Sequence, residues 1–116
     1  MEKQIKSIFK NFEVNGKSIP VEHLRYKGKS KTYVIWTIIS EVPSLSADDD
    51  DLYSVTDVDI HIYSDGNYLD IVKEVKKLMK DNNWSWLEDS TEMYEDDTEL
   101  YHKTITFEKE RMINNG

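Results

Sequence analysis

Three side chains that can ligate a metal ion alternate along one predicted strand. Asp57, Asp59 and His61 are two residues apart, so in an extended chain they point to the same side. Two carboxylates and an imidazole in a row are suitable ligands for a divalent metal. The positions between and beside them are aliphatic: Val58, Ile60 and Ile62. The simpler interpretation is a strand with one apolar and one hydrated face, so we predict no metal site.

The tripeptide Gly28-Lys29-Ser30 matches the end of the phosphate-binding P-loop motif. That motif needs another glycine five residues earlier, where this chain has His23, and it joins a strand to a helix. In this chain a strand is predicted to follow instead. We therefore interpret the tripeptide as the tip of a basic hairpin and predict no nucleotide site.

No catalytic motif can be recognised elsewhere in the chain. The sequence contains no cysteine, and no serine lies in a Gly-x-Ser-x-Gly elbow. The three histidines, His23, His61 and His102, are expected to be ordinary surface side chains. Among the 23 acidic residues, no spacing selects a pair for glycosidase-like chemistry. We therefore predict that the protein is not an enzyme and has no catalytic residue and no cofactor.

An acidic run, Asp48-Asp49-Asp50-Asp51, lies in a predicted loop at 43–51. It does not match a calcium-binding loop, because Leu52 and Tyr53 occupy the positions of a ligand and of the required glycine. Adjacent carboxylates repel one another, so we expect this loop to be hydrated and mobile.

Trp84 and Trp86 would share a face if this stretch is a strand. Two aromatic rings at this spacing could stack on nucleic-acid bases. The neighbouring acids Glu88, Asp89 and Glu92 oppose that function. We favour a place in the core or in a subunit interface.

The length and composition indicate one domain, 1–116. The absence of cysteine excludes disulfides and thiolate metal sites. No apolar run approaches the ~20 residues that span a membrane, and the first residues lack the apolar core of a signal peptide. We therefore expect a cytoplasmic product without a membrane partner.

The net charge of −8 is unevenly distributed. Residues 1–36 contain eight Lys and Arg against three Asp and Glu, whereas residues 37–116 contain seven against twenty. An acidic chain argues against general nucleic-acid binding, which needs many cations at the phosphates. If the basic and acidic parts lie on opposite sides, copies could attract head to tail and build rings. The alternative is that charged loops only keep the protein soluble.

The hydrophobic pattern predicts an α+β fold: a mostly antiparallel sheet of four to five strands with two helices packed on it, in the order α-β-β-(β)-α-β-β. The predicted elements are helices 2–12 and 68–80, strands 19–26, 32–39, 52–63, 84–94 and 99–111, and a frayed tail 112–116. Asn15-Gly16 is interpreted as the end of the first helix. The first two strands are expected to form a hairpin with a turn at 27–30.

Two of these strands carry further information. Residues 33–39 are apolar on both faces, which indicates a central strand with helices on one side and another covering surface on the other. The last strand, which follows an acidic turn at 95–98, alternates. One face contains Tyr101, Ile105 and Phe107; the other contains His102, Thr104, Thr106 and Glu108.

Several segments, taken in order, resemble a known family. They are a helix before Ile19-Pro20-Val21, a strand ending in Tyr26-Lys27-Gly28, a strand opening with Thr32-Tyr33-Val34, the strand 57–64, and the ending from Glu92 to Phe107. This ending places a tyrosine before an acidic turn and then Tyr101-His102-Lys103 before a strand. Over residues 3–110 this layout resembles the small tail-terminator and tail-completion, or head–tail joining, proteins of long-tailed bacteriophages and prophages.

The resemblance implies a structural protein of the virion tail that is made and assembled in the host cytoplasm. Such proteins are homo-oligomers, typically a hexameric ring, that cap the tail tube. The implied partners are further copies, the major tail tube protein and the head-completion or connector protein. Genomic DNA would only pass through the lumen of the ring, where an acidic surface would keep it from sticking.

Charge and position select a candidate interface between copies. Its residues are the basic Arg25, Lys27, Lys29 and Lys31 and the acidic Asp48, Asp49, Asp50 and Asp51. The alternative function is a small acidic inhibitor or immunity-type protein that binds a basic partner enzyme, since such proteins share this size and charge.

Overall fold

A computed structural model describes residues 2–45 and 52–113 of the chain. Its elements, in order, are α1 (Glu2–Ile8), β1 (Glu13–Val14), β2 (Lys17–Ser18), β3 (Val21–His23), β4 (Tyr33–Leu45), β5 (Leu52–Ser64), α2 (Leu69–Asp81), β6 (Ser85–Asp89), β7 (Met93–Glu95) and β8 (Leu100–Ile113). Two helices and a mostly antiparallel sheet confirm the predicted α+β fold. None of the helices in the described residues is long and apolar enough to cross a membrane.

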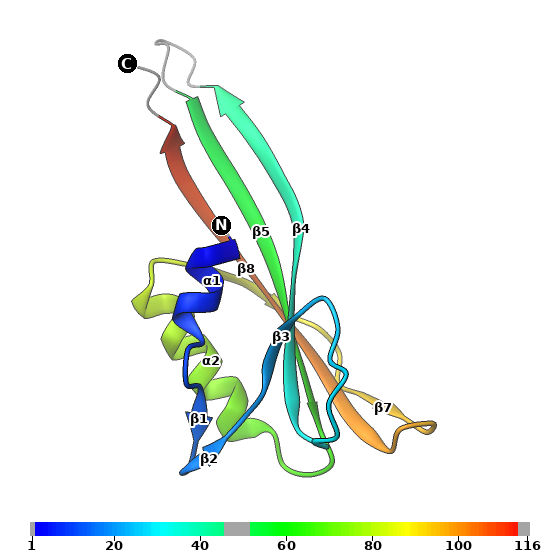
Figure 1. Cartoon of the computed structure of the whole chain (residues 1–116). Helices are drawn as coiled ribbons and strands as arrows, with labels where there is room; N and C mark the ends of the chain where they lie inside the picture. The colour runs from blue at the N-terminus through cyan, green and yellow to red at the C-terminus, as the bar shows by residue number, and fades with distance from the viewer. Residues whose placement is uncertain (1, 46–51, 114–116) are drawn as a thin grey trace.

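The main sheet has the strand order β3-β4-β5-β8-β6, and β7 pairs with the other end of β8 on the same side as β6 (Figure 1). Within the described residues it therefore has six strands, where four to five were predicted. The difference arises because the predicted strand 84–94 is interrupted and pairs with β8 as two short pieces. All pairings are antiparallel except that of β3 with β4.

The predicted hairpin of strands 19–26 and 32–39 is wrong. β3 runs parallel to β4, with Val21 opposite Val34 and His23 opposite Trp36. Parallel neighbours cannot be joined by a tight turn, because the chain must first return to the end where it started. Residues 24–32 make this return, and they begin at Leu24, whose backbone has a φ of 69°.

The first helix is also shorter than predicted, since it ends at Ile8 and not at residue 12. Asn15-Gly16 does not end a helix but forms the turn between the two-stranded pair β1 and β2. Both residues have positive φ, 54° and 78°, as a type I′ hairpin turn requires. Asn-Gly is the strongest short hairpin signal, and it decided the local structure here.

Two predicted boundaries of irregular segments change as well. The predicted loop 43–51 is wrong for residues 43–45, because they continue β4 in pairing with β5. The acidic residues of that prediction, Asp48, Asp49, Asp50 and Asp51, lie outside the described residues. The predicted frayed tail 112–116 is wrong for residues 112–113, because they still pair with β5; residues 114–116 lie outside the described residues.

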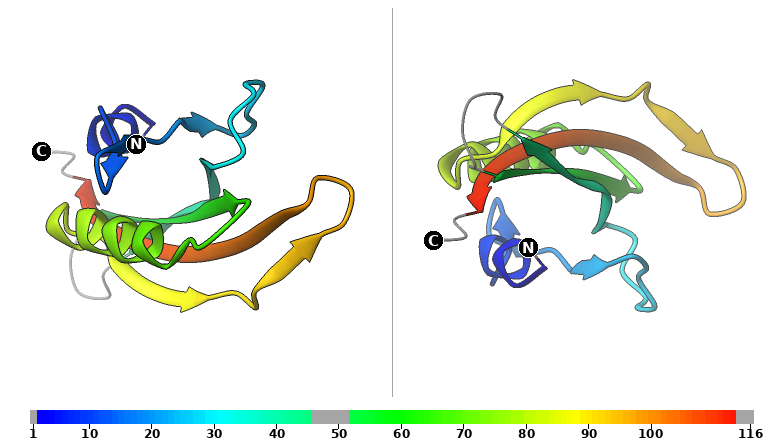
Figure 2. Two further views of the ribbon diagram at one scale, coloured as in Figure 1. Left: turned by 90° about the horizontal axis from the view of Figure 1, so that it is seen from below. Right: turned by 90° about the horizontal axis from the view of Figure 1, so that it is seen from above.

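Both helices lie on one face of the sheet, and the core fills the space between the helices and the sheet (Figure 2). The predicted alternation of β5 is confirmed, since Val58, Ile60 and Ile62 are each 1% exposed or less. α2 contributes its apolar stripe to the same core: Ile71, Val72, Val75 and Met79. In α1 and the turn after it, Ile5, Phe9 and Phe12 are buried although the helix ends early. The helices and the sheet thus hold one apolar layer. Among the described residues no helix packs on the other side of the sheet, so the second covering surface predicted for residues 33–39 is not found there.

Candidate functional site

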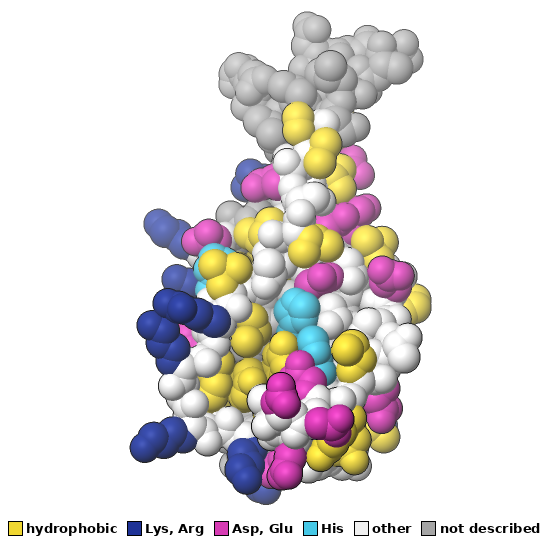
Figure 3. All heavy atoms as spheres, turned by 90° about the vertical axis from the view of Figure 1, so that its right-hand side faces the viewer, with side chains coloured by type: hydrophobic (Ala, Val, Ile, Leu, Met, Phe, Trp, Pro, Cys, Tyr) yellow, Lys and Arg dark blue, Asp and Glu magenta, His cyan; other side chains and the backbone are white. Residues whose placement is uncertain are grey.

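The side of the sheet away from the helices carries ordered rows of polar and aromatic side chains. We call it the open face. Strand register aligns four rows across β4, β5 and β8: Tyr33–Tyr63–His102, Ile35–His61–Thr104, Thr37–Asp59–Thr106 and Ser40–Asp57–Glu108. All twelve residues are partly exposed. Figure 3 views the molecule from this side and shows histidine side chains near the middle of the surface.

A run of stacked rings crosses the first row of the open face. Tyr26, from the loop before β4, stacks on Tyr33 with ring centres 4.4 Å apart. Tyr33 stacks on Tyr63 at 4.8 Å, and Tyr63 on His102 at 4.2 Å. Partial burial, and next the negative charge of Glu95, raise the pKa of Tyr33 and of Tyr63 above the usual value of 10.0. These tyrosines are therefore neutral hydrogen-bonding groups at physiological pH.

Beside this run, two imidazoles and a hydroxyl form a compact cluster. His61 Nδ1 lies 3.1 Å from His102 Nε2, and Thr104 Oγ1 lies 3.0 Å from the first nitrogen and 3.3 Å from the second. Burial, and then the neighbouring His102, lower the pKa of His61, against the opposing effect of Asp59. Burial likewise lowers the pKa of His102, against the opposing effect of Glu95. Both rings therefore favour the neutral form.

The next two rows carry carboxylates. Thr106 donates a hydrogen bond to Asp59 Oδ1 at 2.6 Å. Asp57 raises the pKa of Glu108 chiefly through a side-chain hydrogen bond. Within the described residues, no group of three or more His, Asp or Glu side chains is arranged to hold a metal ion. The row Asp57-Asp59-His61 shares a face as predicted. Asp59 contacts Thr106 of β8, and His61 contacts Thr104 and His102 of β8.

Opposite charges flank the two edges of the sheet. The predicted basic residues Arg25, Lys27, Lys29 and Lys31 are all exposed in the loop between β3 and β4, at one edge. Around β7, at the other edge, exposed carboxylates gather: Glu92, Asp96, Asp97 and Glu99. Figure 3 shows Lys and Arg along one margin of this side of the molecule, and Asp and Glu toward the middle and the other margin. The structure places the basic half of the predicted interface here; its acidic half lies outside the described residues.

The loop with Gly28-Lys29-Ser30 does not form a P-loop, because β4 and not a helix follows it. Its shape depends on Tyr26, whose hydroxyl accepts a hydrogen bond from the Ser30 backbone N–H at 2.9 Å. A Cβ atom on Gly28 would collide with the Tyr26 side chain, so any other residue there would force Tyr26 to shift. The loop is thus held against the open face by the same tyrosine that begins the stacked run.

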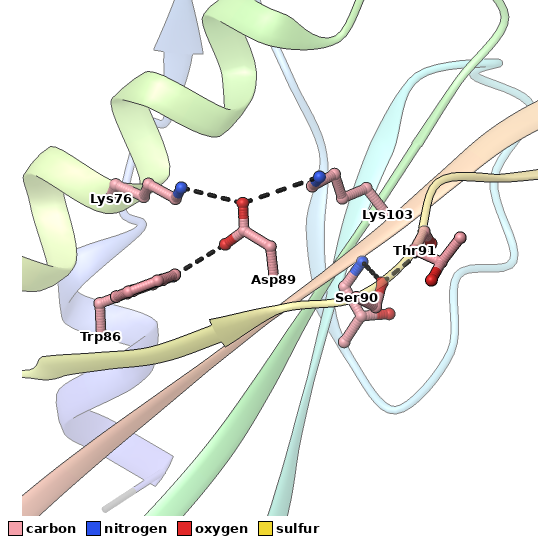
Figure 4. Close-up of polar contacts among 7 residues, drawn as sticks. Lys76, Trp86, Asp89, Ser90, Thr91 and Lys103 are labelled. Carbon is pink, nitrogen blue, oxygen red and sulfur yellow. Dashed lines mark hydrogen bonds and ion pairs between the residues drawn. The ribbon is translucent and has the colours of Figure 1, made fainter.

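A charged cluster around Asp89 joins α2 to the acidic edge (Figure 4). Lys76 of α2 and Lys103 of β8 place their Nζ atoms 3.0 and 3.7 Å from Asp89 Oδ2. The Trp86 indole N–H donates to Asp89 Oδ1 at 2.7 Å. Burial alone would raise the pKa of Asp89, but these hydrogen bonds and the two lysine charges outweigh it and lower the pKa. The cluster therefore fixes β6 against α2.

The two tryptophans of the predicted pair have different environments. Trp84 is 3% exposed and belongs to the core, which is one of the two predicted locations, the core or a subunit interface. Trp86 is 55% exposed, and the Lys76 ammonium lies 5.3 Å from the centre of its ring. The two rings therefore do not form a free stacking surface.

A cavity of about 580 Å³ lies between the β1–β2 pair, the basic loop and the start of α2. Its charged lining is balanced, with Lys17 and Lys31 against Asp65 and Asp70. Asp70 already accepts a hydrogen bond at 2.8 Å from the side-chain amide of Asn15. The cavity thus selects no ligand charge.

Sequence reasoning missed the stacked run and the histidine cluster. The signal was present, since His61 and His102 lie on the faces that were predicted to be hydrated. What was missing was the pairing of β5 with β8, which are separated in the chain by α2. No protein-family model matches the chain, and no curated protein has a matching sequence.

Proposed function

We propose that this chain is a structural protein of a bacteriophage tail, and that its copies join through unlike sheet edges into a ring that caps the tail tube and meets the head connector. The observation that carries the proposal is the opposite charge at the two edges of one sheet. A contact between two different surfaces of identical copies closes into a ring when the rotation between them allows it.

Both edges also expose apolar side chains. β3 pairs with β4 only as far as Trp36, so no other described strand covers that side of residues 37–45. Ile39, at a bulge in β4, is 50% exposed, and Val42 is 55% exposed. At the opposite edge, Trp86 is 55% and Leu87 is 43% exposed. An unpaired edge with exposed apolar side chains is a template for pairing with another chain.

The strand directions suit such a contact. The neighbours β4, β5, β8 and β6 alternate in direction, so β4 and β6 run opposite ways. If a second copy lay beside the first in the same orientation, β6 of the second copy would run antiparallel to β4 of the first. Antiparallel pairing needs no crossover and is the commoner arrangement in sheets. The charged segments beside the two edges would then attract one another across the contact.

The place of this ring in a tail rests on the resemblance to tail-terminator and tail-completion proteins in the layout of the chain. The net charge of −8 suits a lumen through which DNA passes. On this proposal the protein is a virion component without catalysis, and its partners are its own copies, the tail tube protein and the connector protein.

The test is the mass of the purified chain by light scattering across concentrations, with negative-stain images of the most concentrated sample. We expect closed rings, and we expect charge reversal in the basic loop to abolish them: Lys27→Glu, Lys29→Glu and Lys31→Glu together. The matched control reverses three exposed lysines of α2: Lys73→Glu, Lys77→Glu and Lys80→Glu. A second, reciprocal variant reverses the acidic edge: Asp96→Lys, Asp97→Lys and Glu99→Lys. Mixed with the basic-loop variant, it should restore assembly.

Rings that persist after the basic loop is reversed would overturn the edge contact. A chain that stays monomeric at all concentrations, and that does not bind one end of purified phage tail tubes, would overturn the tail assignment. Tight one-to-one binding to a basic enzyme would then support the inhibitor function instead.

A further inference from the structure

The cluster of His61, His102 and Thr104 on the open face has the spacing of a chelating site. Its three facing atoms, His61 Nδ1, His102 Nε2 and Thr104 Oγ1, form a triangle with sides of 3.1, 3.0 and 3.3 Å. We infer that this triangle binds a divalent first-row transition metal ion, with the two imidazole nitrogens as its protein ligands.

The geometry of metal coordination supports this assignment. Zinc binds imidazole nitrogen at about 2.0–2.1 Å in tetrahedral sites, which places two ligand atoms about 3.3–3.4 Å apart. The two nitrogens of the cluster are 3.1 Å apart, so both can ligate one ion when the rings turn toward it and each ring carries its proton on its other nitrogen. The strands need not move, because His61 and His102 lie on β5 and β8, which are paired along their whole length.

The chemistry of the donors selects the class of ion. Imidazole suits zinc, copper and nickel, whereas magnesium and calcium prefer carboxylate, carbonyl and water oxygens. Two histidines are fewer ligands than a closed structural site uses, so water completes the coordination. Thr104 lies within hydrogen-bond distance of both nitrogens, and its hydroxyl can bond to such a water.

A carboxylate lies beside the cluster, because Asp59 occupies the next row of the open face, two residues before His61 on β5. The Tyr63 ring stacks on His102 with ring centres 4.2 Å apart and holds its orientation. The site differs from the predicted row Asp57-Asp59-His61, because its ligands come from two neighbouring strands and not from one.

The experiment uses the full chain without an affinity tag, treated with EDTA and dialysed, and titrated with zinc chloride by isothermal calorimetry. We expect one ion bound per chain, and at least a tenfold loss of affinity in each of two variants, His61→Asn and His102→Gln. These substitutions keep a polar atom near the original nitrogen, so the contact with Thr104 and the fold should persist; circular dichroism checks the fold. His23→Gln is the matched control, since His23 stacks on Trp36 away from the cluster.

Several outcomes would overturn the inference. They are the absence of zinc binding, equal binding by the His61 and His102 variants and the parent chain, or an equal loss in the His23 variant. Magnesium chloride in place of zinc chloride should give no heat of binding, and tight magnesium binding would contradict the assignment of the ion class. Because the site lies within one copy of the chain, these results do not depend on ring formation.

Discussion

The two faces of the sheet are built from the same strands but serve different purposes. On the covered face, Val34, Trp36 and Ile60 have exposures of 1% or less beneath the helices. On the open face, the alternate residues of these strands are partly exposed and interact in pairs across the strands. Apolar burial stabilises in proportion to area and needs no direction, whereas stacking and hydrogen bonding need exact partners. The covered face therefore supplies stability, and the open face and the edges are available for recognition.

Removal of a large side chain from the covered face should have the largest effect. Trp36 is 1% exposed, so Trp36→Ala should lower the free energy of unfolding by about 3–5 kcal/mol. Its neighbour Thr37 on the open face is the control, and Thr37→Ala should cost less than about 1 kcal/mol. Urea unfolding of both variants measures the difference. Similar losses in the free energy of unfolding would show that the two faces contribute equally to stability.

The Asp89 cluster should contribute less. Asp89→Asn removes the charge that Lys76 and Lys103 share, and we expect a loss of about 1 kcal/mol at pH 7, because the cluster is partly exposed. The folded state lowers the pKa of Asp89, so this stabilisation is present above the unfolded pKa near 3.8 and is lost as the pH falls through the lower folded value. Urea unfolding of parent and variant between pH 7 and pH 2 should converge at the acid end. If the difference in the free energy of unfolding between parent and variant stayed constant across this range, the stabilisation would not come from the charge of Asp89.

The stacked run offers a smaller test of the open face. Gly28→Ala should displace Tyr26 from Tyr33, at a cost of about 0.5–1.5 kcal/mol for one aromatic pair. Near-ultraviolet circular dichroism should report the lost stacking. Gly66→Ala is the control, because a Cβ atom there meets nothing within 4 Å. If the two substitutions give the same spectrum, Tyr26 does not order the loop.

The smallest effect on stability is expected at the free edge of β4. Ile39→Lys replaces a side chain that is 50% exposed, so the free energy of unfolding should change by no more than about 0.5 kcal/mol. The same substitution should disrupt assembly, because a charge on an edge strand opposes pairing with another chain. Unfolding and light scattering on one sample separate the two effects. Loss of stability without loss of assembly would contradict the proposed function of this edge in assembly.

Local patterns in the sequence predicted most of the elements. Strict alternation identifies β5 and the two faces of β8, and the helical period identifies α2. Local signals were misinterpreted where two meanings compete. Asn-Gly can end a helix or turn a hairpin, and here it turns β1 into β2. The return of the chain from β3 to β4 had no local signal, because a loop of polar residues suits either connection.

The sequence by itself determined which residues are apolar, which positions share a face, and that basic and acidic residues concentrate in different parts of the chain. Only the tertiary structure decided that β8 lies beside β5, which brings His102 and Thr104 to His61. It also decided that the basic loop and the acidic turn lie at opposite edges of one sheet. The physical reason is that alternation depends on neighbours in the chain, whereas strand order depends on how α2 and the core pack between segments that are distant in the chain.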